Sequence, residues 1–243
     1  MIHLTLLSGW GVNARVWQPL APHWPADCQV NTVEWPGYAE HDSAPQAHDL
    51  AALAEAMRDT LSPESIWVGW SLGGLLAACL LSHLPPPKAL ILLGTGPKFC
   101  QPGGVSNAEL GAFQEAFARD PEATWRHFLR WQTQGEPKPG DAHRRLRELL
   151  GSHPSADIAT LRAGLGHLAT LDATRILEQP PCPVQHVYGG RDRLVSPEQR
   201  QKGMLIEGVG HCPMVSQPVR LAFTLARLTK TSMLNSSALE TPP

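Results

Sequence analysis

The sequence lacks the cysteine spacing of a disulfide framework or a zinc site. Its cysteines are odd in number, widely spread and without a C-x-x-C pair, at positions 28, 79, 100, 182 and 212. Disulfide scaffolds use even sets of cysteines, and structural zinc sites use closely spaced pairs of ligands. We therefore expect reduced, buried thiols and no metal site.

A long apolar run and an excess of charge are also missing. No apolar stretch approaches the roughly 18 residues of a membrane-spanning helix, and no basic leader precedes the apolar residues 2–7. The formal net charge of -2 provides no general attraction to nucleic acid or to an anionic membrane surface. We expect a soluble, cytoplasmic protein that acts as a monomer.

What is present is an ordinary globular composition, 42% hydrophobic and 17% charged, arranged as short apolar runs. The runs are bounded by glycine and proline, which is typical of strands buried on both faces of a sheet. Helical patterns separate the first four runs, so we predict an α/β fold with a mostly parallel sheet and helices on both faces. The runs cover residues 2–7, 28–33, 65–70, 88–93, 184–188 and 203–208, and the separating helices are expected at 14–24, 49–61 and 72–84.

The alternation of strands and helices stops after residue 97. Residues 98–178, the helical insertion, carry only helical patterns and are predicted to form a lid above one edge of the sheet. Residues 1–97 and 179–228 are expected to form the core. The tail 229–243 is rich in Ser, Thr and Pro and is predicted to be flexible.

The pattern G-x-S-x-G occupies residues 69–73, between a predicted strand and a predicted helix. In that context it is typical of a nucleophile elbow, in which the glycines permit a tight reversal with the serine at its apex. The reversal places Ser71 at a helix N-terminus, where the helix dipole and free amides favour developing negative charge. Ser71 is therefore the predicted nucleophile.

A serine hydroxyl needs a base, and the base needs an orienting carboxylate. Asp192 lies in the loop after one predicted strand, and His211 lies in a glycine-flanked loop after the next. Each alone has an ordinary structural explanation, since Asp is common in turns. The order Ser, Asp, His is nevertheless the one expected after such an elbow, and carboxyl ends of parallel strands meet at one edge. We predict that Ser71, Asp192 and His211 form a catalytic triad.

Acyl transfer also needs two backbone N–H groups that bind the oxyanion. One is expected from Leu72, which follows the nucleophile. The other is expected from Trp10, because Gly9 and Gly11 let the loop after the first strand approach closely. The predicted reaction is acyl transfer to water, which requires no metal or cofactor.

These motifs resemble the alpha/beta-hydrolase superfamily over nearly the whole chain, up to residue 228. Within it, the sequence is most similar to the pimeloyl-acyl-carrier-protein methyl ester esterases of biotin synthesis. The similar stretches are GWGVNARVW at 9–17, IWVGWSLGGL at 66–75, FLRWQTQG at 128–135 and YGGRDRLV at 188–195. One departure is Ser8, which stands where the family has the histidine of its H-G-W-G loop and bears on how that loop is held.

The resemblance implies that the enzyme hydrolyses the methyl ester of a pimeloyl chain carried on acyl carrier protein. It implies the triad named above and a set of oxyanion and substrate contacts. That set consists of Trp10, Leu72, His211 and the lid residues Phe128, Leu129, Arg130, Trp131 and Gln132.

Acyl carrier protein is acidic, so a basic surface is expected where it binds. Residues 126–147 contain six basic side chains against Glu136 and Asp141. We hypothesise that four arginines contact the carrier protein: Arg126, Arg130, Arg144 and Arg145. The alternative is a solvated helix face without a partner.

Other activities fit the same motifs. A general short-chain carboxylesterase, a thioesterase or a carbon–carbon bond hydrolase uses the same triad. A non-catalytic ligand-binding receptor is the alternative from another class, and the intact triad argues against it.

Overall fold

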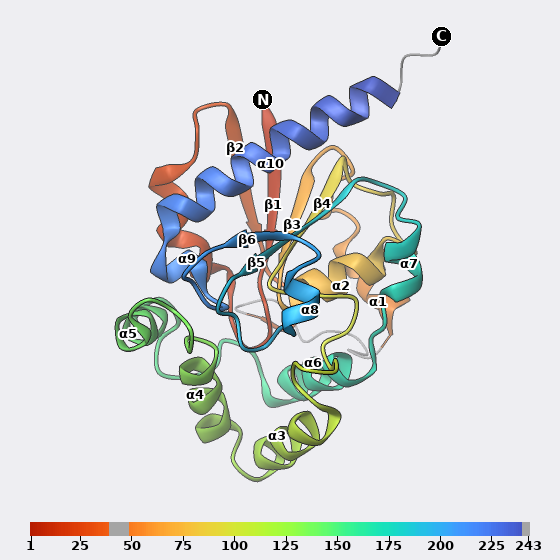
Figure 1. Cartoon of the computed structure of the whole chain (residues 1–243). Coiled ribbons are helices and arrows are strands. Elements are labelled where there is room, and N and C mark those ends of the chain that lie inside the picture. Colours follow the sequence, from red (N-terminus) through yellow and green to blue (C-terminus); the bar gives the residue numbers. More distant parts are fainter. Residues whose placement is uncertain (39–48, 240–243) are drawn as a thin grey trace.

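The computed structural model describes residues 1–38 and 49–239, with side chains described up to residue 232. A six-stranded sheet with the order β2-β1-β3-β4-β5-β6 forms its centre, and all its strand pairs are parallel (Figure 1). The predicted α/β class is confirmed. The strands are β1 (Ile2–Leu7), β2 (Cys28–Val33), β3 (Ile66–Trp70), β4 (Ala89–Leu93), β5 (Val184–Gly189) and β6 (Met204–Ile206).

Burial along the strands follows their place in the sheet. Every residue of the central strands β3 and β4 is buried, as their continuous apolar runs predict. β2 differs, because Gln29, Asn31 and Thr32 are exposed. The prediction of burial on both faces is therefore wrong for β2, which is an edge strand with a sheet neighbour on one side only.

Helices cover both faces of the sheet (Figure 1). The 3-10 helix η1 (Ala14–His23) packs against α10 (Pro218–Leu239) on one face, while α1 (Leu50–Met57) and α2 (Leu72–Leu80) lie on the other. The helix expected at 14–24 is a 3-10 helix because Pro19 and Pro22 lack the N–H that an α-helical ladder needs.

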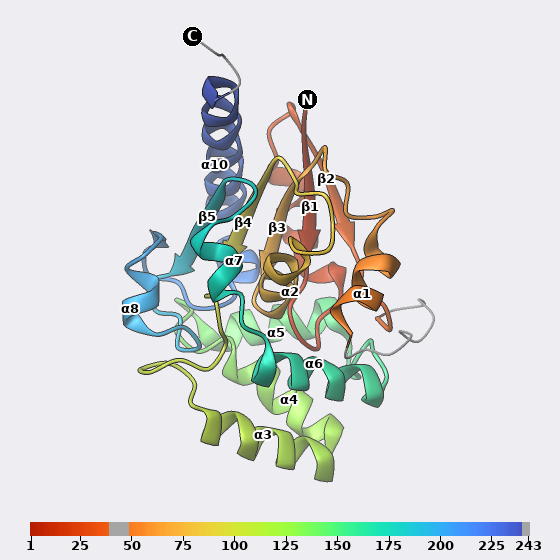
Figure 2. The ribbon, with the colours of Figure 1, turned by 90° about the vertical axis from the view of Figure 1, so that its right-hand side faces the viewer.

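Five helices occupy the chain between β4 and β5. Figures 1 and 2 show α3 to α6 gathered beyond the end of the sheet to which the strands point, which is the edge formed by their carboxyl ends. Local sequence starts these helices: Ser106 and Glu109 form a reciprocal capping box, and Asp120 caps the next helix ahead of Pro121. The helices are α3 (Asn107–Arg119), α4 (Pro121–Trp131), α5 (Pro139–Leu150), α6 (Ile158–Thr170) and α7 (Thr174–Glu178).

The C-terminal helix extends further than expected. α10 continues to Leu239, and Thr229 and Ser232 are 0% and 1% exposed. The Ser232 hydroxyl accepts a hydrogen bond from Gln185 of β5 at 2.5 Å. The tail that was predicted to be flexible from residue 229 is therefore helical as far as Leu239, and buried side chains at its start tie the helix to the sheet.

Two short helices complete the fold. α8 (Pro197–Arg200) follows β5, and α9 (Pro213–Ser216) follows β6. Among the helices in the described ranges, none combines the length and apolar character needed to cross a membrane.

Candidate active site

Ser71 stands at a strained reversal between β3 and α2. Its φ of 55° and ψ of -126° lie where residues other than glycine are rarely found. The Ser71 N–H donates to the Leu93 carbonyl at 2.9 Å, which ties the turn to β4. A Cβ on Gly69 would lie 2.4 Å from the Cα of Gly74, so the reversal requires glycine at position 69. The hydroxyl is thereby held at the N-terminus of α2.

Asp192 and His211 form a buried pair. Asp192 Oδ2 lies 2.7 Å from His211 Nδ1, and the two side chains are 0% and 1% exposed. The Leu194 N–H donates to Asp192 Oδ1 at 2.9 Å, and Arg200 donates to the Asp192 carbonyl at 2.7 Å. A carboxylate at Nδ1 keeps the proton on that nitrogen, which leaves Nε2 as the acceptor. His211 Nε2 is buried and has no hydrogen-bond partner among the described residues.

Ser71 and His211 lie at the same corner of the sheet. Trp70, the residue before Ser71, donates its indole N–H to the His211 carbonyl at 2.9 Å, and the two rings are 5.4 Å apart. At the end of β4, a Cβ on Gly94 would lie 3.1 Å from the His211 ring and 3.4 Å from Asp192 Oδ2. The structure has no hydrogen bond between Ser71 Oγ and His211 Nε2. In unliganded enzymes this bond is often long and tightens when substrate binds.

The two expected oxyanion donors both have unused N–H groups. Neither Trp10 nor Leu72 donates its backbone N–H to another residue in the described part of the chain. The loop that carries Trp10 passes close to the elbow. A Cβ on Gly73 would lie 2.3 Å from the Ser8 carbonyl oxygen, and one on Gly9 would lie 3.0 Å from the Ser71 Cβ.

Aromatic side chains hold this loop, in which Ser8 stands where the resemblance led us to expect a histidine. Trp35 donates its indole N–H to the Ser8 carbonyl at 2.9 Å. The Gly11 N–H donates to the Tyr38 hydroxyl at 2.9 Å, and Trp125 of α4 donates to the Gly11 carbonyl at 2.7 Å. The Ser8 hydroxyl is buried without a described partner, so the loop is fixed through its backbone.

The Trp10 side chain connects this loop to the helical insertion. Its indole N–H donates to the Leu161 carbonyl of α6 at 2.7 Å. A Cβ on Gly164, one turn further along α6, would lie 2.6 Å from Trp10 Cδ1. The ring makes edge-to-face contacts, at centroid distances between 5.1 and 5.7 Å, with Phe113, Phe117 and Phe128.

Comparison with known proteins identifies the family. The alpha/beta hydrolase family matches residues 6–222. The chain belongs to the alpha/beta hydrolase family. A pimeloyl-acyl-carrier-protein methyl ester esterase from Klebsiella pneumoniae is 30% identical over an alignment 239 residues long that covers 93% of each chain. One from Pseudoalteromonas atlantica is 35% identical over 199 residues, which cover 79% of this chain and 77% of that one.

Solved structures show the same fold. An esterase from Exiguobacterium antarcticum superposes with a TM-score of 0.79 at 19% identity, covering 95% of this chain and 92% of that one. At this level of identity the likeness concerns the hydrolase fold alone.

The stretch 128–132 of this hydrolase divides into a buried and an exposed part. Phe128, Leu129 and Gln132 are buried, and Trp131 is half-buried. Gln132 Nε2 has no hydrogen-bond partner among the described residues. Arg130, which was predicted to belong to the same substrate contacts, is exposed.

Sequence reasoning missed Glu136, which it counted only as a surface charge. Its side chain is buried and contacts the loop of His211. The available signal was its place directly after the distinctive FLRWQTQG stretch.

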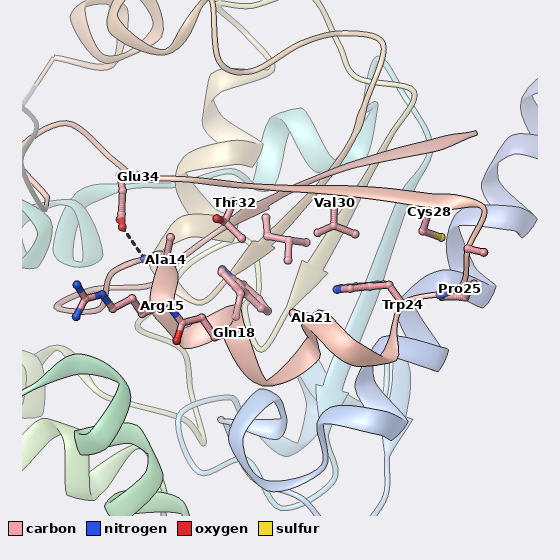
Figure 3. Close-up of a pocket in the computed structure, with 13 residues that line it drawn as sticks. Ala14, Arg15, Gln18, Ala21, Trp24, Pro25, Cys28, Val30, Thr32 and Glu34 are labelled. Carbon is pink, nitrogen blue, oxygen red and sulfur yellow. Dashed lines mark hydrogen bonds between the residues drawn. The ribbon is translucent and has the colours of Figure 1, made fainter.

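An apolar cavity lies beside the elbow of this hydrolase. Gly9 and Leu72 line it together with Leu76, Ala163 and Gly164 under α6. A second, wider groove between η1 and β2 is shown in Figure 3, where Glu34 accepts a hydrogen bond from the Ala14 N–H at 2.9 Å. None of the predicted site residues lines that groove, so groove size does not locate the chemistry.

Proposed function

We propose that this esterase hydrolyses the methyl ester of a pimeloyl chain carried on acyl carrier protein, the activity named for its curated relatives. The buried Asp192–His211 pair carries the proposal, since it lies beside the strained Ser71 at the carboxyl edge of the sheet. Such an arrangement is suited to activating a serine hydroxyl.

The proposed reaction proceeds by acyl transfer. Ser71 Oγ attacks the ester carbonyl while His211 Nε2 takes its proton, and Asp192 stabilises the imidazolium. The Trp10 and Leu72 N–H groups bind the oxyanion, and loss of one such donor costs about 3 kcal/mol of transition-state stabilisation. His211 returns the proton to the departing methanol. It then activates a water that releases the free carboxylate from Ser71.

The acyl chain is proposed to bind in the apolar cavity between Leu72 and α6. Gln132 offers a buried, unpartnered amide N–H to a polar atom of the substrate. Ser71 is only 8% exposed beneath the helical insertion. We therefore propose that the insertion acts as a lid that moves to admit the substrate.

The carrier protein is proposed to dock on the exposed arginines of α4 and α5. Arg126 is paired with Glu122 at 3.0 Å, and Arg144 with Asp141 at 2.8 Å, so part of the basic charge is locally balanced. The double variant Arg126→Glu, Arg144→Glu is expected to slow turnover of the carrier-bound ester and to spare a small chromogenic ester. Arg227→Glu on α10 is the matched control for surface charge reversal. Equal effects on both substrates would contradict the docking surface.

The cytoplasm is the proposed location, supported by the free state of all five cysteines.

The decisive experiment is rescue of a biotin-requiring bacterial strain that lacks its own methyl ester esterase. We expect the wild-type chain to restore growth, and Ser71→Ala to fold normally without rescue or ester hydrolysis. Hydrolysis of short esters without rescue would indicate a general carboxylesterase instead.

A further inference from the structure

Glu136 is a buried carboxylate with no part in the proposed triad. It lies in the loop between α4 and α5 and is 3% exposed. Its Oε1 accepts a hydrogen bond at 2.6 Å from the N–H of Cys212, the residue that directly follows His211 in the chain. Its Oε2 accepts a hydrogen bond from the Ser216 hydroxyl at the end of α9. One carboxylate of the helical insertion thus binds the loop of the proposed base at two points.

The backbone around Glu136 lies close to the two loops that carry Asp192 and His211. A Cβ on Gly135, whose φ is 92°, would lie 2.3 Å from the carbonyl oxygen of Arg191. A Cβ on Gly210 would lie 2.7 Å from the carbonyl oxygen of Gln134. Glycine at these two positions therefore permits backbone contact between the insertion and the loops before Asp192 and His211.

We propose that Glu136 is a positioning residue that fixes the loop of His211 and stabilises the charge that His211 gains during catalysis. The inference rests on the proposed role of His211 as the base. By holding the Cys212 N–H, Glu136 keeps the imidazole against Asp192. Its negative charge favours the imidazolium formed when His211 accepts the proton of Ser71.

The free-energy cost of burying the Glu136 carboxylate supports a functional role for its charge. Burial raises the pKa of Glu136, opposed by its hydrogen bonds to Ser216 and Cys212 and by the charge of His211. An ionised carboxylate in this place therefore costs folding free energy. A glutamine at position 136 would accept the same hydrogen bond from the Cys212 N–H at a lower cost in folding free energy.

Ionisable groups other than Glu136 also lie at this loop. Asp192 contacts the imidazole at Nδ1, at 2.7 Å. Burial raises the pKa of the Cys212 thiol well above its usual range, so the thiol stays neutral. Arg145 of α5 donates to the Val215 carbonyl at 3.2 Å. Among the groups that contact the loop, Glu136 is therefore the negative charge supplied by the helical insertion.

The test compares Glu136→Ala and Glu136→Gln with the wild type on a small chromogenic ester. Glu136→Ala removes the acceptor and is expected to lower kcat by about tenfold, with little change in KM. Glu136→Gln keeps an acceptor and nearly the same shape, so it is expected to recover part of kcat. Because Glu136→Gln lacks the charge, its acidic limb of kcat/KM should move to lower pH. The exposed Glu148→Gln on α5 is the control and should match the wild type.

The outcomes separate this inference from the proposed function. A folded Glu136→Ala variant with wild-type kcat overturns the positioning role. An unshifted pH profile for Glu136→Gln overturns the electrostatic role. Ser71→Ala, measured in parallel, tests the function itself, since activity retained there would refute the serine mechanism whatever Glu136 does.

Discussion

Replacing Gly164 with alanine tests how the helical insertion packs against the loop that carries Trp10. Inside a helix, this replacement ordinarily stabilises by about 1 kcal/mol. Here the new Cβ would lie 2.6 Å from Trp10 Cδ1 and 3.3 Å from Leu72 Cδ2. Trp10 has little room to yield, because it is 1% exposed and its indole N–H is bound to Leu161 at 2.7 Å.

The magnitude follows from these opposing terms. Overpacking of a filled core costs about 1–3 kcal/mol, which equals or exceeds the helix-propensity gain. Gly111 in α3 is the matched control, since a Cβ there meets nothing within 4 Å. Gly111→Ala should stabilise by about 1 kcal/mol, so Gly164→Ala should be about 1–3 kcal/mol less stable than this control.

Urea unfolding of both variants measures that difference, and steady-state kinetics measures its effect on the site. Displacing the Trp10 backbone would remove part of the proposed oxyanion interaction, so kcat of Gly164→Ala is expected to fall by up to about 100-fold. Gly111→Ala should keep wild-type kcat. Equal stability and equal activity of the two variants would refute the described contact between α6 and Trp10.

Three further outcomes are expected. Tyr38→Phe removes the acceptor of the Gly11 N–H and should lower kcat by about fivefold without raising KM, as measured by steady-state kinetics. Burial raises the pKa of the Cys79 and Cys182 thiols to about 11, so a thiol reagent at about pH 8 should label neither until the protein is unfolded. Because the pKa of Glu136 is raised above its ordinary 4.5, the native state binds this proton more tightly than the unfolded chain. Its contribution to stability is present below pH 4.5 and is lost as the pH rises through the raised pKa. Glu136→Gln should therefore gain stability relative to the wild type, in urea unfolding, as the pH rises above 4.5.

Local patterns predicted most of the fold. Apolar runs bounded by glycine and proline correspond to all six strands of the sheet, because a buried parallel strand is apolar on both faces. The edge strands β2 and β6 depart from burial on both faces, since position in a sheet depends on partners far away in the chain. α10 was missed although Leu221, Leu225 and Leu228 recur at helical spacing, because the serines and threonines after residue 228 suggested a frayed end.

The candidate site was predictable where it depends on motif and order. The sequence located Ser71, Asp192 and His211 at one edge of the sheet, and the structure joins the last two by a hydrogen bond. Their catalytic roles stay a prediction. The supports of the site were not predictable, because Tyr38 and Glu136 reach it across long sequence separations.

The aromatic side chains that hold the loop of Ser8 and Trp10 through hydrogen bonds do not change their charge near neutral pH. Indole N–H groups do not titrate, and burial raises the pKa of Tyr38 above its ordinary value of 10. A histidine in the same place would change its protonation within the working range of an enzyme. Acidification should therefore leave the hydrogen bonds that hold this loop unchanged.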